Sequence, residues 1–252
     1  MRAFALALTL LTRLPVRLSG EIDTADHGRA VVAYPLVGVL LGLIQLGVAW
    51  LAILAGLPVW PVAILLVTAQ VLLTGALHLD GLADSADAWL GGHGDRERTL
   101  RIMKDPASGP AGVCALLLVL LARTAALATL LSLGTLLALL PLLLAPLLSR
   151  TACTALFLSL PYVRTGGLGH AAATTLSPRR VGTAVAIAML VTVFVGGWLG
   201  LLMLGTALLV LAAGRRQMRQ RLGGFTGDTA GALVEITETA VLLSAALWLG
   251  RA

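Results

Sequence analysis

The chain has little charge for its length. Only 12% of its 252 residues are Asp, Glu, Lys or Arg, whereas 58% are hydrophobic. A soluble globular domain has about 25% charged and about 45–50% apolar residues. Half the usual charge cannot cover the surface of a soluble protein of this size, so the composition argues against a soluble enzyme, a disordered segment and a nucleic-acid-binding domain.

Cysteine and lysine are also scarce. Cys114 and Cys153 lie in apolar stretches and in no metal-binding spacing, so we expect neither a disulfide nor a thiolate metal site. Lys104 is the only lysine, and the net charge of +6 comes from arginines that occur in short clusters between apolar runs. This distribution is typical of membrane topology rather than of nucleic-acid binding.

Apolar runs of about 20 residues, the length that crosses a bilayer, recur along the chain. The predicted spans are 31–55, 58–79, 111–131, 135–160 (interrupted by Pro141 and Pro146), 181–213 and 229–250. The run 181–213 is long enough for two spans, with a turn near Gly196–Gly197 or Gly200. The sequence therefore predicts an all-α, polytopic integral membrane bundle of about 6–7 transmembrane helices, with residues 1–252 forming a single domain.

The basic residues predict the orientation. With the N-terminus in the cytoplasm and seven spans, most arginines fall in inside segments and only Arg251 lies outside, as the positive-inside rule requires. Arg13 interrupts the apolar N-terminal stretch, so we expect 1–30 to be a retained, interfacial cytoplasmic segment and not a cleaved signal peptide. The polar segment 80–110 is expected to be a cytoplasmic catalytic loop.

The first acidic cluster is HLDGLADSADAWLGG. Asp80, Asp84 and Asp87 are spaced i, i+4, i+7, which places three carboxylates on one face of a helix. Like charges so placed repel, and a hard divalent cation such as Mg²⁺ would relieve the repulsion. The alternative is a solvated helix end. His78 lies two residues upstream and is either a catalytic or a hydrogen-bonded structural residue.

The second acidic cluster is GGFTGDTAGALVEITETA. Asp228 and Glu235 are seven residues apart and share a helical face, with Glu238 almost one turn further on. A glycine-rich turn precedes them, and its N–H groups can approach a phosphate closely, although a plain turn with a helix cap is the alternative. The candidate phosphate-binding residues of this turn are Gly224, Thr226 and Gly227.

The predicted topology brings both clusters to the same leaflet, where the chain also supplies cations. These are Lys104, Arg150 and Arg164. Arg123, which is similar in depth to Arg150, either pairs with a membrane acid or snorkels. Carboxylates that hold Mg²⁺, a glycine turn and nearby cations indicate chemistry on a diphosphate at the cytoplasmic membrane face.

At these motifs the chain resembles the adenosylcobinamide-GDP ribazoletransferase (cobalamin synthase) family. The matching blocks run in family order along nearly the whole chain: TRLPV, YPLVGVLLG, HLDGLADSADAWLGG, RTLRIMKDPASGPAGV, LLSRTA, LPYVRTGGLG and GGFTGDTAGALVEITE. The resemblance implies a multi-pass enzyme of the cell inner membrane that acts in the last steps of cobalamin biosynthesis and uses Mg²⁺. It would transfer the cobinamide phosphate of adenosylcobinamide-GDP to α-ribazole or its 5′-phosphate, giving adenosylcobalamin or its 5′-phosphate and GMP.

On this resemblance we assign hypothetical roles to the candidate residues. The metal ligands would be Asp80, Asp84 and Glu235, supported by Asp87 and Glu238. Asp228 would be the general base, with Lys104 and His78 as further catalytic candidates. Lys104, Arg150 and Arg164 would contact phosphates.

Two alternatives remain open at this stage. One is another Mg²⁺-dependent membrane transferase with a prenyl diphosphate or CDP-alcohol donor, although Gly81 directly follows the first Asp and departs from the motif spacing of both. The other is a cation or proton transporter, which usually carries its carboxylates near the midplane on repeated halves. Oligomeric state and association with other corrinoid-pathway enzymes also remain open.

Overall fold

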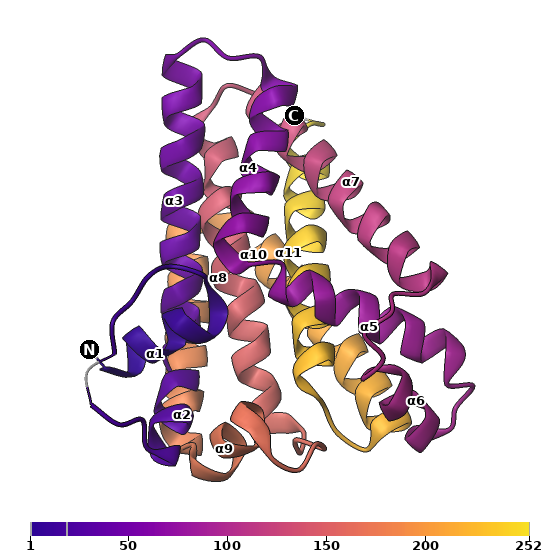
Figure 1. Ribbon diagram of the computed structural model, residues 1–252. Coiled ribbons are helices and arrows are strands. Elements are labelled where there is room, and N and C mark those ends of the chain that lie inside the picture. Colours follow the sequence, from indigo (N-terminus) through magenta and orange to yellow (C-terminus); the bar gives the residue numbers. More distant parts are fainter. Residues whose placement is uncertain (1, 19, 252) are drawn as a thin grey trace.

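The computed structural model describes residues 2–18 and 20–251, which fold into eleven helices (Figure 1). The six longest are α3 (Tyr34–Leu54), α4 (Val59–Thr74), α7 (Pro110–Ser132), α8 (Leu136–Ser159), α10 (Pro178–Leu222) and α11 (Gly227–Leu249). The shorter ones are α1 (Arg2–Leu11), α2 (Thr24–Val31), α5 (Leu77–Gly91), α6 (Arg96–Ile102) and α9 (Gly167–Thr175). The described chain contains no strand beyond an isolated bridge between Tyr162 and Phe225.

Five of these helices are long and apolar enough to cross a membrane, and α4 together with α5 makes a sixth candidate. The longest, α10, is a hairpin of two arms, because Gly197 has non-helical angles (φ +54°, ψ −131°). Val185 and Met189 of the first arm line the same small cavity as Leu204 and Leu208 of the second, so the arms run back alongside each other. Counting both arms confirms the prediction of about 6–7 transmembrane helices and the predicted turn near Gly196–Gly197.

The central helix is α8, which packs against α3, α10 and α11. Helix α8 is continuous through Pro141 and Pro146, so the predicted interruption at these prolines is wrong. Each proline removes one backbone hydrogen bond, but proline is tolerated in membrane helices where neighbouring helices cover the freed backbone. Here α3 covers it at a glycine: a Cβ on Gly42 would lie 3.1 Å from the carbonyl oxygen of Leu142, which loses its helical donor to Pro146.

The second predicted span, 58–79, ends earlier than expected. Gly75 and Ala76 both have left-handed angles (φ +61° and +58°), so α4 stops at Thr74 and α5 leaves at an angle of 89°. Glycine adopts such angles without strain, and the side chain of Arg13 packs where a Cβ on Gly75 would lie. The expected loop 80–110 is therefore largely helical, because α5 and α6 occupy most of it.

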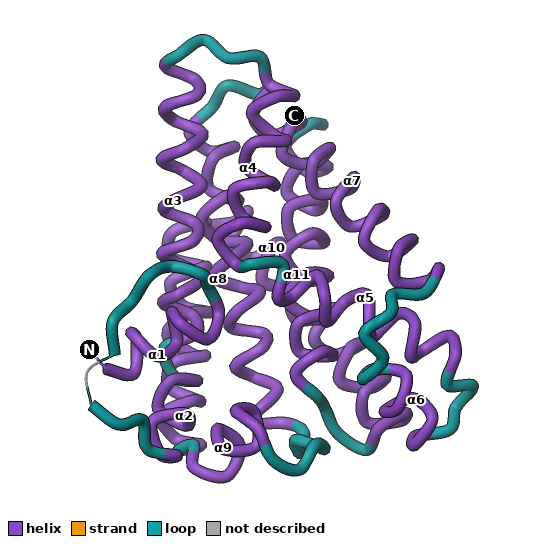
Figure 2. Tube along the Cα trace, in the orientation of Figure 1, coloured by secondary structure: helices purple, strands orange, loops and turns teal. Residues whose placement is uncertain are grey.

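The chain turns at two ends of the bundle (Figure 2). One end carries the α3–α4 and α7–α8 connections and the C-terminus, and the other carries α2, α6, α9 and the start of α11 (Figure 1). The N-terminal helix α1 packs against α2 and α3 through a buried face that includes Leu6, Ala7 and Leu11. The end with α6 and α9 holds the residues discussed next.

Candidate active site

Three aspartates lie on one face of α5, at the spacing predicted from the sequence. The right-angle turn after α4 aims this helix across the bundle, where it packs against α11 and α7. As a helix of 15 residues set perpendicular to α4, α5 adds no crossing of its own. Its acidic face lies at the same end of the bundle as the start of α11.

Helices α5 and α11 touch through their backbones. A Cβ on Gly81 would lie 2.7 Å from the carbonyl oxygen and 2.9 Å from the Cα of Asp228, and a Cβ on Gly231 would lie 3.2 Å from the Cα of His78. Real Cβ atoms essentially never approach a backbone atom as closely as at Gly81, so this glycine is needed for the approach, whereas a Cβ at Gly231 would make a tight contact with α5. The close approach brings Asp228, in the first turn of α11, to the aspartates of α5.

The carboxylates of Asp80, Asp84 and Asp228 form one electrostatic group. Burial and the neighbouring carboxylates of Asp80 and Asp228 together raise the pKa of Asp84 to about 6, although Arg164 opposes them. Arg164 pairs with Asp228, with 2.6 Å between Nη2 and Oδ2 and both side chains partly exposed. The two acidic motifs, separated by more than 140 residues in the sequence, therefore meet at a surface that solvent and substrate can reach.

Two loops are pinned together to place Arg164. The N–H of Phe225 donates to the carbonyl of Pro161 (2.9 Å), and the N–H of Val163 donates to the carbonyl of Phe225 (3.0 Å). Gly224 is needed for this contact, because a Cβ there would overlap the Pro161 carbonyl. The close contact with Pro161 is therefore a structural reason for a glycine at position 224, separate from the expected role in binding phosphate.

The turn into α11 is a helix cap. The Thr226 side chain accepts a hydrogen bond from the N–H of Thr229 (3.2 Å), and the Thr229 hydroxyl accepts one from the N–H of Thr226 (2.9 Å). Thr226 is fully buried, whereas Gly227 next to it is exposed. Thr226 therefore acts as the helix cap, which was the alternative to phosphate binding. Gly227 is exposed, so a ligand can reach it.

A cationic pocket of about 500 Å³ adjoins the carboxylates. It is lined by Glu97, Leu100, Arg101, Lys104, Val163, Arg164, Thr165, Gly166 and Gly167. The expected substrate contacts Lys104 and Arg164 thus come together from segments 60 residues apart. Arg101 was missed by sequence reasoning, although its spacing of three residues from Lys104 in RTLRIMK was a usable signal.

Asp87 has a structural task. Its carboxylate accepts hydrogen bonds from the N–H groups of Gly109 (2.7 Å) and Gly112 (2.9 Å) at the start of α7. A carboxylate at a helix N-terminus satisfies free N–H groups and opposes the positive end of the helix dipole. Asp87 therefore ties α5 to α7, and a metal would have to compete with both bonds.

Glu235 lies in the bundle interior instead of the carboxylate group. Its Oε2 is 2.6 Å from Nη2 of Arg123, and both side chains are buried. Arg123 also donates to Thr239 (3.0 Å). The charge of Glu235, an expected metal ligand, is thus neutralised by the guanidinium of Arg123. Of the two alternatives for Arg123, pairing with a membrane acid is the one that the structure shows.

Glu238 is the centre of a second buried network. It accepts hydrogen bonds from Arg150, Gln70 and Ser149, and Gln70 in turn accepts one from Gln45. The expected phosphate contact by Arg150 is not compatible with this position, because Arg150 is only 1% exposed. Two amide side chains inside apolar runs were the sequence signal for this network.

His78 is buried where α5 crosses α11, and its Nδ1 has no hydrogen-bond partner among the residues that the structure describes. Residues 2–18 and 20–251 contain no group of three His, Cys, Asp or Glu side chains arranged to hold a metal ion unaided. Any metal here would need further ligands from substrate or water. Mg²⁺ binds in this way in many enzymes, through one or two carboxylates, several waters and substrate phosphates.

Comparisons with known proteins show the family to which the chain belongs. The model of the cobalamin-5-phosphate synthase family matches residues 3–246. Adenosylcobinamide-GDP ribazoletransferase from Pseudomonas putida (strain W619) is 51% identical over 249 residues, covering 98% of this chain and 99% of that protein.

Two further relatives carry the same name. The Pseudomonas paraeruginosa (strain PA7) protein is 52% identical over 98% of both chains, and the Pseudomonas fluorescens (strain Pf-5) protein is 51% identical over 98% of this chain and all of the other. No solved structure matches the chain. The match along nearly its whole length places this membrane protein in the cobalamin-5-phosphate synthase family, as its motifs predicted.

Proposed function

We propose that the chain is a membrane transferase that joins adenosylcobinamide-GDP to α-ribazole or its 5′-phosphate and releases GMP. The observation that carries this proposal is the close approach of Gly81 to Asp228, which gathers three carboxylates beside a cationic pocket. A ribose hydroxyl of α-ribazole forms a bond to the phosphorus nearer cobinamide, the bridging P–O bond breaks, and GMP departs. The names of the relatives supply the substrate and the geometry supplies a site for a diphosphate.

Asp80 and Asp84 are the carboxylates that would hold Mg²⁺. They lie one turn apart on α5. Burial of Asp84 and the negative charge of its neighbours make it unfavourable for both carboxylates to be ionised unless a cation is bound. Hard oxygen donors in this number suit Mg²⁺ when substrate phosphates complete the set. The ion would neutralise phosphate oxygens of the diphosphate.

Asp228 is our candidate for the general base. The proton of the attacking hydroxyl passes to its carboxylate, which Arg164 orients by the 2.6 Å pair. The adjoining pocket is lined by Lys104, Arg101 and Arg164, which would bind the GMP portion and stabilise the charge that develops on the leaving phosphate.

The site belongs on the cytoplasmic face. The first and last turns of α10, which connect to α9 and α11, also carry arginines, and the positive-inside rule gives such clusters to the inner side. Soluble nucleotide substrate would reach the pocket from that side, and the C-terminus would lie outside.

The test is GMP release by the purified protein in detergent, with adenosylcobinamide-GDP and α-ribazole as substrates. EDTA is expected to abolish release and added Mg²⁺ to restore it. Asp84→Asn is expected to lower kcat by at least about 10²–10³-fold, the loss seen when a charge-stabilising group is removed. The matched control is Glu21→Gln, which neutralises an exposed carboxylate outside the site.

Full activity of Asp84→Asn, or full activity of the unaltered chain in EDTA, would contradict the metal assignment but not the proposed transferase reaction. Release of product from a prenyl diphosphate or CDP-alcohol, with none from adenosylcobinamide-GDP, would contradict the proposed reaction itself.

A further inference from the structure

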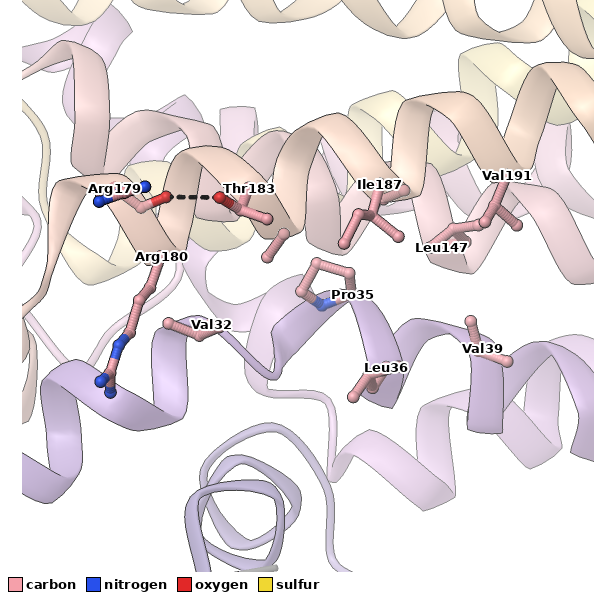
Figure 3. A pocket seen from close by; sticks show the side chains of 12 residues that line it. Val32, Pro35, Leu36, Val39, Leu147, Arg179, Arg180, Thr183, Ile187 and Val191 are labelled. Atoms are coloured by element: carbon pink, nitrogen blue, oxygen red, sulfur yellow. Dashed lines mark hydrogen bonds between the residues drawn. The ribbon is translucent and has the colours of Figure 1, made fainter.

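An apolar groove runs between α3 and the first arm of α10, with Leu147 of α8 at its floor (Figure 3). Its volume of about 630 Å³ falls in the range of sites that bind small molecules. Leu36 and Val39 line one wall, and Ile187 and Val191 line the other. Leu36 is 58% and Ile187 56% exposed, so the groove is open to the surroundings of the bundle along its length.

Two arginines close one end of the groove. Arg179 and Arg180 are exposed, and within residues 2–18 and 20–251 neither forms a salt bridge. They stand in the first turn of α10, where an acidic residue would be the usual complement to the helix dipole and none is present. The result is concentrated positive charge at the end of an apolar slot.

We propose that this groove binds an anionic phospholipid, with its phosphate at Arg179 and Arg180 and one acyl chain along α3 and α10. Arginine binds phosphate through two parallel hydrogen bonds, and basic pockets between membrane helices bind acidic lipid headgroups. The dimensions agree: Val191 lies eleven residues beyond Arg180, which is about 16 Å at about 1.5 Å per residue. One leaflet of the hydrocarbon core is about 15 Å deep.

The lipid would act as a spacer between two helices that hardly touch. Helices α3 and α10 contact each other little, and each packs instead on α8. The site uses no residue of the candidate active site and does not depend on the proposed reaction.

The experiment is native mass spectrometry of the full chain released from nanodiscs that contain equal amounts of phosphatidylglycerol and phosphatidylcholine. One phosphatidylglycerol per chain is expected to remain bound, with a preference of at least about tenfold, or about 1.4 kcal/mol, over phosphatidylcholine. Arg179→Gln with Arg180→Gln removes the headgroup contacts and is expected to abolish the preference. Ala184→Phe fills the groove, keeps both arginines and is expected to abolish retention of the lipid.

Two controls match these variants. Arg216→Gln with Arg219→Gln removes two exposed arginines of the second arm, and Ala186→Phe adds the same bulk on the exposed side of the first arm, outside the groove. Both are expected to retain phosphatidylglycerol. Thermal unfolding in detergent, with and without added phosphatidylglycerol, checks that each variant is folded.

Equal retention of the two lipids by the unaltered chain would overturn the proposal, as would unchanged retention in Ala184→Phe. A thermal shift produced equally by glycerol phosphate would show an anion site without an acyl chain. A lipid-free dimer that Ala184→Phe dissociates would show that a second copy occupies the groove. Either of these last two results also refutes the lipid.

Discussion

Removing one partner of a buried ion pair gives the sharpest test of the bundle interior. Within the described part of the chain, Glu235→Leu leaves the guanidinium of Arg123 with two acceptors, the backbone carbonyl of residue 235 and the Thr239 hydroxyl. Arg123 is 1% exposed and Glu235 4%, so water cannot replace the lost carboxylate. An uncompensated buried charge typically costs about 3–5 kcal/mol, a large part of the stability of a folded protein.

The double variant Arg123→Met with Glu235→Leu removes both charges. Apolar side chains of similar volume in place of a buried pair are often neutral or stabilising, so the double variant is expected to recover most of the loss. Unfolding in mixed detergent micelles, followed by tryptophan fluorescence, measures the three free energies of unfolding. The reasoning is refuted if Glu235→Leu unfolds at the same point as the unaltered chain, or if the double variant is no more stable than the single.

The same double variant separates two roles for Glu235. If Glu235 is structural, the rate of GMP release by the double variant should lie within about tenfold of that of the unaltered chain, or about 1.4 kcal/mol in activation free energy. A metal ligand predicts a loss of at least about 10²–10³-fold in a protein that remains folded. We expect the first result, because the carboxylate already has a guanidinium 2.6 Å away.

Three further outcomes follow from the contacts of the site. Gly81→Ala places a Cβ 2.7 Å from the carbonyl oxygen of Asp228, so it is expected to push α5 away from α11. We expect kcat for GMP release to fall about tenfold or more, and the free energy of unfolding to fall by about 1–3 kcal/mol. Asp87→Ala removes two hydrogen bonds to the start of α7, including that from Gly109, and is expected to cost about 1.5–3 kcal/mol with KM unchanged; a large rise in KM with normal stability would contradict this role. Arg164→Gln is expected to raise KM for adenosylcobinamide-GDP much more than for α-ribazole, and equal effects on both substrates would contradict its place in the nucleotide pocket.

The membrane spans and the acidic face of α5 were predictable from local patterns. Apolar runs of bilayer length, the i, i+4, i+7 spacing of Asp80, Asp84 and Asp87, and the glycines at the turn of α10 each specify structure through neighbours in the chain. The clusters of arginine indicate which ends of the spans lie together, and the motif order indicates the family.

The partners of the acidic residues were decided only by the tertiary structure. Asp80, Asp84, Glu235 and Glu238 all stand at or inside apolar runs, and nothing in their spacing separates a solvent-facing carboxylate from one paired with an arginine. The separation arises because α5 turns through 89° after Gly75 and meets the start of α11, leaving the later turns of α11 to face α7 and α8.

Sequence by itself therefore determined a polytopic helical transferase with carboxylates at one end, because composition and periodicity act locally along each helix. Only the packed bundle brought Asp80, Asp84 and Asp228 into one electrostatic group and paired Glu235 and Glu238 with arginines in the interior. The physical reason is that a buried charge takes whichever opposite charge the neighbouring helices bring within reach, and that neighbour lies far away in the sequence.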